Sequence, residues 1–330
     1  MAKAKYSVIL PNYNTPSDRF STYPGANKAS AVELIDIAGK QGAVGGVEML
    51  AMAGPMGLND GTKQEIKAAL ARNDLKLVAI LPMTYGEEYS KGSLGAADPK
   101  IRRMALDQMK GTIDLAAEMD CPYIGQWPGQ DGWDYYFEAD YQKIYGWWVE
   151  GMQELADHNP QMRLGLEAKP FEPRSYSFIS NTPKTLLLCE DIARSNVGVC
   201  LDIGHSLFGH ENLGEAVAMS QMKNKRLFHL HMNDNYGDMD GDMYFGSVHL
   251  LTFVELFYWV KKTGYEYWRS VDIFPYRTDP AGTVLESVRW MEAIDSLVEK
   301  AGMAKLDALI ACGDPLENSR FFRELLFGTK

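Results

Sequence analysis

Four short apolar runs in the second half of the chain each end in a side chain that can bind a cation. They are Leu164-Gly165-Leu166-Glu167, Val199-Cys200-Leu201-Asp202, Phe228-His229-Leu230-His231 and Ser270-Val271-Asp272. Three carboxylates gathered around one imidazole would repel one another unless a divalent cation neutralised them. Carboxylate-rich ligation with a single histidine suits manganese, magnesium or cobalt better than a structural zinc. One such residue alone is more often capped or salt-bridged, whereas four such strand ends together point to a shared cation.

A second set of acidic and imidazole side chains follows two of these runs. His205 comes three residues after Asp202, and Asp240 and Asp242 stand in a glycine-containing loop after His231. Alternating aspartates in a flexible loop can supply oxygen ligands to a second cation, which Asp202 could bridge to the first. A solvated turn explains the same pattern equally well. His229 points to the same side of its strand as His231 and could be a ligand or a hydrogen-bond partner of a ligand.

The elements that must position these residues alternate regularly between strands and helices. The expected strands are 6–10, 43–50, 75–81, 123–127, 163–168, 197–203, 226–232 and 268–274. The expected helices are 28–40, 62–73, 98–119, 138–158, 182–195, 212–224, 248–263 and 281–300. Strand-then-helix units favour parallel strands with helical crossovers, and eight of them close a barrel. The sequence therefore predicts the α/β class and a (β/α)8 TIM barrel.

The barrel interpretation gives the polar strand ends a common location. Chemistry in such barrels lies at the carboxyl ends of the strands, where residues from neighbouring strands converge. An open doubly wound sheet is the alternative, but Pro11-Asn12-Tyr13 follows the first strand instead of a glycine-rich phosphate-binding turn. No long linker interrupts the alternation. We expect residues 1–300 to form one barrel domain and residues 301–330 a helical extension, with a helix at 305–312.

Composition and charge narrow the classes of partner. The chain has 33 basic and 44 acidic residues and a net charge of −11, which disfavours binding to a phosphate backbone. Its 4 cysteines are widely separated, and the N-terminal apolar run is too short for a signal-peptide core. No apolar run reaches the roughly 18 residues of a membrane span. These features favour a cytoplasmic protein with neither a nucleic-acid nor a membrane partner.

Six motifs in this order resemble the xylose isomerase-like TIM barrel superfamily, specifically its sugar isomerases of the xylose and rhamnose isomerase type. They are Trp127-Pro128-Gly129-Gln130-Asp131-Gly132, Glu167-Ala168-Lys169-Pro170, Asp202-Ile203-Gly204-His205, His231-Met232-Asn233-Asp234, Asp240-Gly241-Asp242-Met243-Tyr244-Phe245-Gly246 and Asp272. The resemblance extends from about residue 90 to about residue 290. Each motif is weak alone, whereas six in the family's order are specific.

The resemblance implies a role for each of these residues. It implies a first metal held by Glu167, Asp202, His231 and Asp272, and a second held by Asp202, His205, Asp240 and Asp242. It implies Mn²⁺, or else Mg²⁺ or Co²⁺, with two ions per chain. The implied catalytic residues are Lys169, His205 and Asp240, and the implied substrate contacts are Trp127, Phe20 and His229.

The function that the resemblance implies is metal-dependent interconversion of an unphosphorylated aldose and ketose by a metal-assisted 1,2-hydride shift, in a homodimer or homotetramer. The alternative is a single-metal ketose 3-epimerase, or a related deglycosidase, in which carboxylates of the fifth and eighth strands transfer a proton. A non-catalytic sugar-binding barrel also stays open, whereas the net charge of −11 disfavours the related abasic-site endonucleases. The chain departs from xylose isomerases around residues 49–57, where it lacks their histidine and aspartate, and it is shorter.

Overall fold

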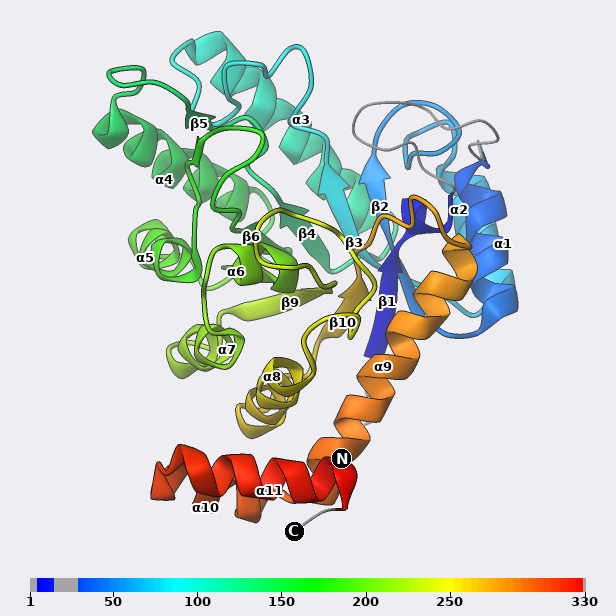
Figure 1. The fold of residues 1–330 in the computed structure, drawn as a ribbon. Coiled ribbons are helices and arrows are strands. Elements are labelled where there is room, and N and C mark those ends of the chain that lie inside the picture. Colours follow the sequence, from blue (N-terminus) through cyan, green and yellow to red (C-terminus); the bar gives the residue numbers. More distant parts are fainter. Residues whose placement is uncertain (1–4, 15–28, 329–330) are drawn as a thin grey trace.

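A computed structural model describes residues 5–14 and 29–328 as a closed barrel of parallel strands surrounded by helices (Figure 1). Neighbouring strands follow the order β1-β10-β9-β8-β6-β4-β3-β2. Their bounds are β1 (Lys5–Ile9), β2 (Gly46–Ala51), β3 (Lys76–Pro82), β4 (Tyr123–Gln126), β6 (Arg163–Glu167), β8 (Val197–Asp202), β9 (Leu227–Met232) and β10 (Trp268–Val271). The predicted (β/α)8 TIM barrel is confirmed.

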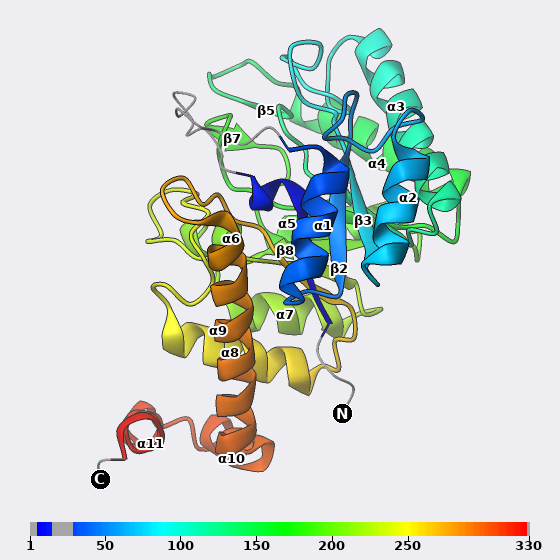
Figure 2. The same cartoon turned by 90° about the vertical axis from the view of Figure 1, so that its right-hand side faces the viewer.

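The helices between the strands form an outer layer that covers the barrel (Figures 1 and 2). They are α1 (Ala31–Gln41), α2 (Lys63–Arg72), α3 (Pro99–Glu118), α4 (Tyr141–His158), α5 (Thr182–Ile192), α6 (Ile203–Phe208), α7 (Leu213–Met222), α8 (Leu250–Lys262) and α9 (Pro280–Ala301). Local sequence sets several starts. Asp98 accepts a hydrogen bond from Lys100 N at 2.8 Å ahead of Pro99, and Ser30 and Glu33 form a capping box.

Five strands end earlier than the sequence predicts, β1, β4, β6 and β8 by one residue and β10 by three. β1 ends at Ile9 and passes into a 3₁₀ turn, Leu10–Tyr13, because Pro11 has no N–H to continue the ladder. β10 ends at Val271 rather than at Phe274. Beyond Val271, the side chain of Asn12 forms the backbone hydrogen bonds that a neighbouring strand would otherwise form. Its Nδ2 donates to Ile273 O at 2.5 Å, and its Oδ1 accepts from Ile273 N at 3.3 Å.

Several small elements lie outside the predicted pattern. α6 follows Asp202 directly, and β5 (Gly132–Trp133) pairs antiparallel with β7 (Tyr176–Ser177). These segments are too short to show a hydrophobic period. After α9, α10 (Met303–Cys312) contains the predicted helix, and α11 (Pro315–Phe327) is an additional one.

The C-terminal helices lie away from the carboxyl ends of the strands. α9 runs back along the barrel, and both views place α10 and α11 at its far end (Figures 1 and 2). Leu306 and Leu309 of α10 are buried, whereas no described side chain of α11 is. Over residues 5–14 and 29–328, none of the helices has the length and apolar character needed to cross a bilayer.

A buried aspartate fastens the loops at the carboxyl end of β4. Asp131 Oδ1 accepts hydrogen bonds from Ser93 N and Gly95 N, both at 2.9 Å, and its Oδ2 accepts one from Ser93 Oγ at 2.5 Å. Its backbone carbonyl accepts from Phe178 N at 2.9 Å. Burial raises the pKa of this carboxyl to about 6. Asp131 thus joins three loops around the segment that carries Trp127.

We expect Asp131→Ala to lower the free energy of unfolding by about 3 kcal/mol, because three donors to a buried carboxylate lose their acceptor. Asp131→Asn keeps one acceptor oxygen and should cost less. Urea denaturation measures both, with the exposed Asp60→Asn as control. Since the folded pKa is raised, ionisation costs wild-type stability as the pH rises from 3.8 to about 6. This loss should be absent in Asp131→Asn, and an equal pH slope in the two proteins would contradict the assignment.

Candidate metal centre

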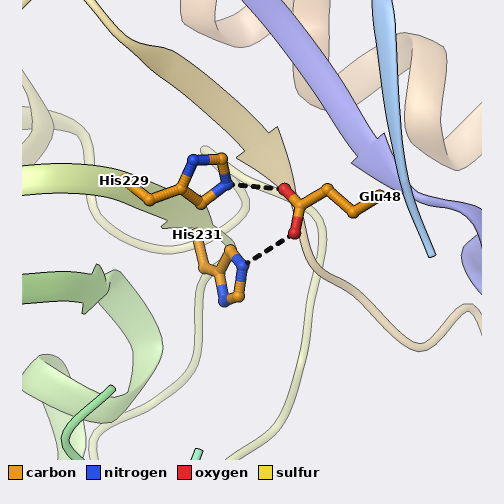
Figure 3. A group of neighbouring side chains, drawn as sticks. All are labelled: Glu48, His229 and His231. Atoms are coloured by element: carbon orange, nitrogen blue, oxygen red, sulfur yellow. Dashed lines mark hydrogen bonds and ion pairs between the residues drawn. The ribbon is translucent and has the colours of Figure 1, made fainter. Parts of the chain in front are cut away.

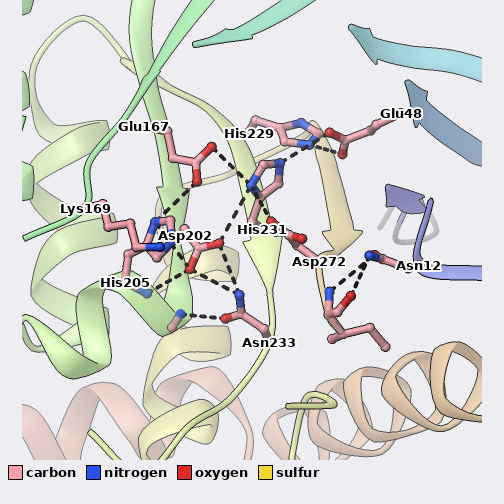
Figure 4. A network of polar contacts seen from close by, with 12 residues as sticks. Asn12, Glu48, Glu167, Lys169, Asp202, His205, His229, His231, Asn233 and Asp272 are labelled. Atoms are coloured by element: carbon pink, nitrogen blue, oxygen red, sulfur yellow. Dashed lines mark hydrogen bonds and ion pairs between the residues drawn. The ribbon is translucent and has the colours of Figure 1, made fainter. Parts of the chain in front are cut away.

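The four polar strand ends predicted from the sequence come together at the carboxyl end of the barrel (Figure 4). Glu167 ends β6, Asp202 ends β8, His231 lies near the end of β9, and Asp272 follows β10. Asp202 and His231 stand opposite each other in the β8–β9 register. Each of the four offers one ligand atom, and these atoms all lie within 4.8 Å of one another.

The centre of this group is His231 Nδ1, and its surroundings are those of a cation ligand. This nitrogen is buried and makes no hydrogen bond to any described residue. Three carboxylate oxygens face it: Glu167 Oε2 at 3.4 Å, Asp202 Oδ2 at 3.8 Å and Asp272 Oδ2 at 3.3 Å. A divalent cation can satisfy an unbonded ring nitrogen among buried carboxylates. The residues present therefore fit a metal ion.

The pKa values of the three carboxylates show how strongly burial and neighbouring charges act on this group. Burial, together with the charges of Asp202 and Glu167, raises the pKa of Asp272 to about 8 despite the opposing effect of His231. Burial and the carboxylates of Glu167 and Asp240 likewise raise the pKa of Asp202. Burial opposes ionisation of Glu167 as well, but His231, His205 and Lys169 hold its pKa below the ordinary value.

Two buried asparagine side chains, Asn233 and Asn12, hold the carboxylates of this group in place by hydrogen bonds. Asn233 Nδ2 donates to both carboxylate oxygens of Asp202, at 3.2 and 3.1 Å, while its Oδ1 accepts from Gly204 N at 2.6 Å. Asn12 fixes the backbone of Ile273 and so the position of the preceding residue, Asp272 (Figure 4). Both amides are buried and have their polar atoms paired.

A second polar group adjoins the first. Lys169 Nζ lies 2.8 Å from Asp240 Oδ2 and 3.0 Å from Glu172 Oε2. His205 Nδ1 donates to Ala168 O at 3.0 Å, which leaves His205 Nε2 directed at Asp240 Oδ2, 3.2 Å away. The structure thus brings the three predicted catalytic side chains, Lys169, His205 and Asp240, into contact.

Electrostatics couple this second group to the first. Burial opposes protonation of His205, but Asp202 and Asp240 raise its pKa to about 9. Burial and the nearby charges of Asp240, Asp272 and Asp202 raise the pKa of Asp242 well above its usual value. Within the described chain, no set of three or more ligand atoms within 4.8 Å includes His205, Asp240 or Asp242. A second cation at these residues stays a prediction.

The predicted substrate contacts fall in different places. Trp127 follows β4, and its ring lies 5.5 Å from Lys169 Nζ and 5.1 Å from the ring of Tyr85. His229 is buried in the barrel interior, where its ring stacks on Tyr123. Contact of His229 with a substrate stays a prediction. Phe20 lies outside the described residues.

Glu48 is the site residue that sequence reasoning missed. It lies on β2, is fully buried, and its carboxylate contacts His229 and His231. Burial opposes ionisation, but the two histidines hold the pKa of Glu48 well below its usual value. The signal was a charged residue inside the apolar run Gly46-Val47-Glu48-Met49-Leu50. The polar residues predicted to form the site end their strands, whereas Glu48 lies in the middle of β2.

Cation binding at this centre should depend on pH. The pKa of Asp272 in the cation-free protein is about 8, so a cation must displace its proton at neutral pH. The apparent affinity for Mn²⁺ should fall by at least about tenfold per unit as the pH drops below 8, because His231, whose pKa despite burial is raised well above its usual value by Glu167 and Glu48, must lose a proton as well. Calorimetric titration at pH 6, 7 and 8, in buffers of different ionisation enthalpy, measures both affinity and proton release. A constant affinity without proton release would contradict the assignment of Asp272 as a ligand.

The fold and this cluster define the class of the protein: a (β/α)8 barrel with a carboxylate-rich candidate metal centre at the carboxyl ends of its late strands. The chain belongs to the xylose isomerase-like TIM barrel family, whose sequence profile matches residues 33–294.

Individual relatives cover the barrel. The chain is 27% identical over 227 residues to a xylose isomerase of Thermus thermophilus, covering 67% of this chain and 58% of that protein. It therefore spans about three fifths of the length of this relative. Among solved structures, an L-ribulose 3-epimerase superposes with a TM-score of 0.71 at 14% identity, over 90% of this chain and 96% of the other. A D-psicose 3-epimerase from Clostridium cellulolyticum H10 gives 0.67 at 18% identity, over 90% and 98%.

Proposed function

We propose that this protein is a divalent-metal-dependent isomerase that interconverts an unphosphorylated aldose and its ketose. The observation that carries the proposal is the placement of Lys169, whose ammonium group is fixed by Asp240 and Glu172 next to the four-ligand centre. A fixed cationic donor can stabilise negative charge that develops on a carbonyl oxygen. The sequence similarity to xylose isomerases supports the same class of reaction.

Each residue of the site has a definite task in this proposal. Glu167, Asp202, His231 and Asp272 would hold the cation, which when bound supplies Lewis-acid polarisation of a sugar carbonyl. Lys169 would donate a hydrogen bond to that carbonyl oxygen. The His205–Asp240 pair, with Nε2 and Oδ2 3.2 Å apart, would take up and return the proton of the neighbouring hydroxyl.

The loops around the site favour a sugar without phosphate. The segments after β9 and β10, residues 233–249 and 272–279, contain Arg277 as their only lysine or arginine. A phosphate group normally requires several donors or a cationic cluster. The Trp127 ring beside Lys169 instead offers an apolar face to the C–H groups of a sugar.

A ketose 3-epimerase is the second candidate, and one observation favours it. Glu167 and Asp272, the carboxylates of β6 and β10, lie in a single four-ligand group, and such a pair can remove a proton from one face of a carbon and return it to the other. The solved epimerases with the same fold are consistent with this reaction.

One experiment separates the two. The protein is incubated with Mn²⁺ and a panel of unphosphorylated aldoses and ketoses in D₂O, and the products are identified by NMR. Isomerisation by direct transfer of hydrogen between C1 and C2 gives the partner aldose or ketose without deuterium. Epimerisation through a carboxylate gives a new ketose carrying deuterium at C3. If no sugar of the panel is converted, the isomerase proposal is wrong.

A further inference from the structure

Glu48 makes an unusual contact across the interior of the barrel. β2 and β9 are separated in the barrel by β1 and β10, yet the Glu48 side chain reaches β9 (Figure 3). Its Oε1 lies 2.6 Å from His229 Nε2, and its Oε2 lies 3.3 Å from His231 Nε2. All three side chains are at most 1% exposed. One carboxylate therefore serves two buried imidazoles.

This contact determines which nitrogen of each ring carries hydrogen. An ionised carboxylate can only accept hydrogen bonds, so the Nε2 atoms of His229 and His231 must both be the donors. A neutral imidazole that carries hydrogen on Nε2 has its lone pair on Nδ1. In His231, Nδ1 is the atom that faces Glu167, Asp202 and Asp272 at 3.3 to 3.8 Å.

His229 holds the carboxylate in place from the other side. Its ring stacks on Tyr123, with the centroids 4.9 Å apart and the planes inclined by 24°. Gly165 makes room for that tyrosine, because a Cβ at Gly165 would lie 2.0 Å from Tyr123 Oη. The His229 ring is thus held by stacking on Tyr123 and by its hydrogen bond to Glu48 Oε1, and the second oxygen of Glu48 is left for His231.

We propose that Glu48 is a positioning residue that fixes the ring orientation and the tautomer of His231, so that His231 presents Nδ1 as the ligand atom for a divalent cation. Carboxylates that bind the distal nitrogen of a metal-ligating histidine act in this way. The inference rests on the proposed metal dependence and is independent of the identity of the sugar. It assigns His229 to the support of the ligand, through the shared carboxylate.

Calorimetric titration with Mn²⁺ tests the role in metal binding. Glu48→Gln keeps the shape but presents an NH₂ group to one of the imidazoles, and we expect Mn²⁺ affinity to fall about 10- to 100-fold. His229→Asn leaves the contact between Glu48 and His231 and should cost less affinity than Glu48→Gln. The control is Asp114→Asn, which breaks an exposed carboxylate–histidine pair of 2.8 Å with His158 and should leave the affinity unchanged. Wild-type affinity in folded Glu48→Gln would overturn the proposal.

A second measurement needs no variant that perturbs the barrel. ¹⁵N-histidine NMR of the Zn²⁺-loaded wild-type protein should show His231 with hydrogen on Nε2 and Zn²⁺ on Nδ1. Hydrogen on Nδ1 with Zn²⁺ on Nε2, or no effect of Zn²⁺ on either nitrogen, would overturn the proposal even if Glu48→Gln did not fold. These readouts involve no sugar. The protein could show the expected tautomer and affinity loss and yet convert no sugar. That outcome would contradict the proposed reaction and still support the role of Glu48.

Discussion

Asp272→Asn should abolish turnover, by about 10³-fold or more, while the barrel stays folded. The substitution removes one of four ligand groups and its charge from the centre, which forfeits several kcal/mol of stabilisation for a bound cation and for the charge it must balance. Mn²⁺ affinity, measured by calorimetry, should fall in parallel. Asp60→Asn removes the same charge from an exposed side chain and should change neither quantity.

The same substitution should have the opposite effect on the stability of the cation-free protein. The pKa of Asp272 is raised from 3.8 to about 8 in the fold, so this carboxyl favours folding below pH 3.8 and loses that contribution as the pH rises towards 8. Asp272→Asn cannot ionise and should lose less stability between pH 5 and 8 than wild type does. Thermal unfolding in EDTA measures this. A variant that turns over sugar normally, or that unfolds at neutral pH, would contradict the role given to Asp272.

Lys169→Met should lower turnover by about 10²- to 10³-fold without weakening cation binding. The ammonium group lies 2.8 Å from Asp240 and 3.0 Å from Glu172, and an ammonium group has no lone pair with which to bind a cation. Its loss removes a preorganised donor to the carbonyl oxygen and a positive charge that competes with a cation. Turnover should therefore fall while Mn²⁺ affinity is kept or increased.

The matched control for Lys169→Met is Lys143→Met, which removes an exposed ammonium group paired with Asp140 at 3.0 Å. That variant should keep both turnover and affinity, because exposed pairs of this kind contribute little. If Lys169→Met lost Mn²⁺ binding together with turnover, Lys169 would act by holding the site together, and its assignment to the substrate carbonyl would be wrong.

The barrel and the meeting of the four polar strand ends were predictable because they depend on local patterns. Each of the runs before Glu167, Asp202 and His231 is an apolar strand, and parallel strands bring their carboxyl ends to one face. The exact ends of the strands were harder to predict. β10 ends at Val271, because beyond it the side chain of the distant Asn12 forms hydrogen bonds with the backbone of Ile273. No local pattern reports such a long-range contact.

Glu48 and α11, which the sequence analysis did not predict, differ in whether the sequence carries a local signal for them. Glu48 is a charged residue within a strand whose partners, His229 and His231, lie on a strand that is not its neighbour, so its pairing follows from barrel closure alone. α11 carried a local signal, since Asp314 caps the helix ahead of Pro315. That signal was present in Gly313-Asp314-Pro315, and Phe321, Phe322 and Leu325 recur at helical spacing and pack against the core, so α11 was predictable from the sequence.

The most direct test of the metal centre is anomalous X-ray diffraction from crystals grown with Mn²⁺, recorded at the manganese edge. A cation at this centre would give a strong anomalous peak within bonding distance of Glu167, Asp202, His231 Nδ1 and Asp272, whose ligand atoms lie within 4.8 Å of one another. A further peak beside His205, Asp240 and Asp242 would add the second cation. No peak among the first four residues in Mn²⁺-saturated crystals would show that these residues do not bind a cation.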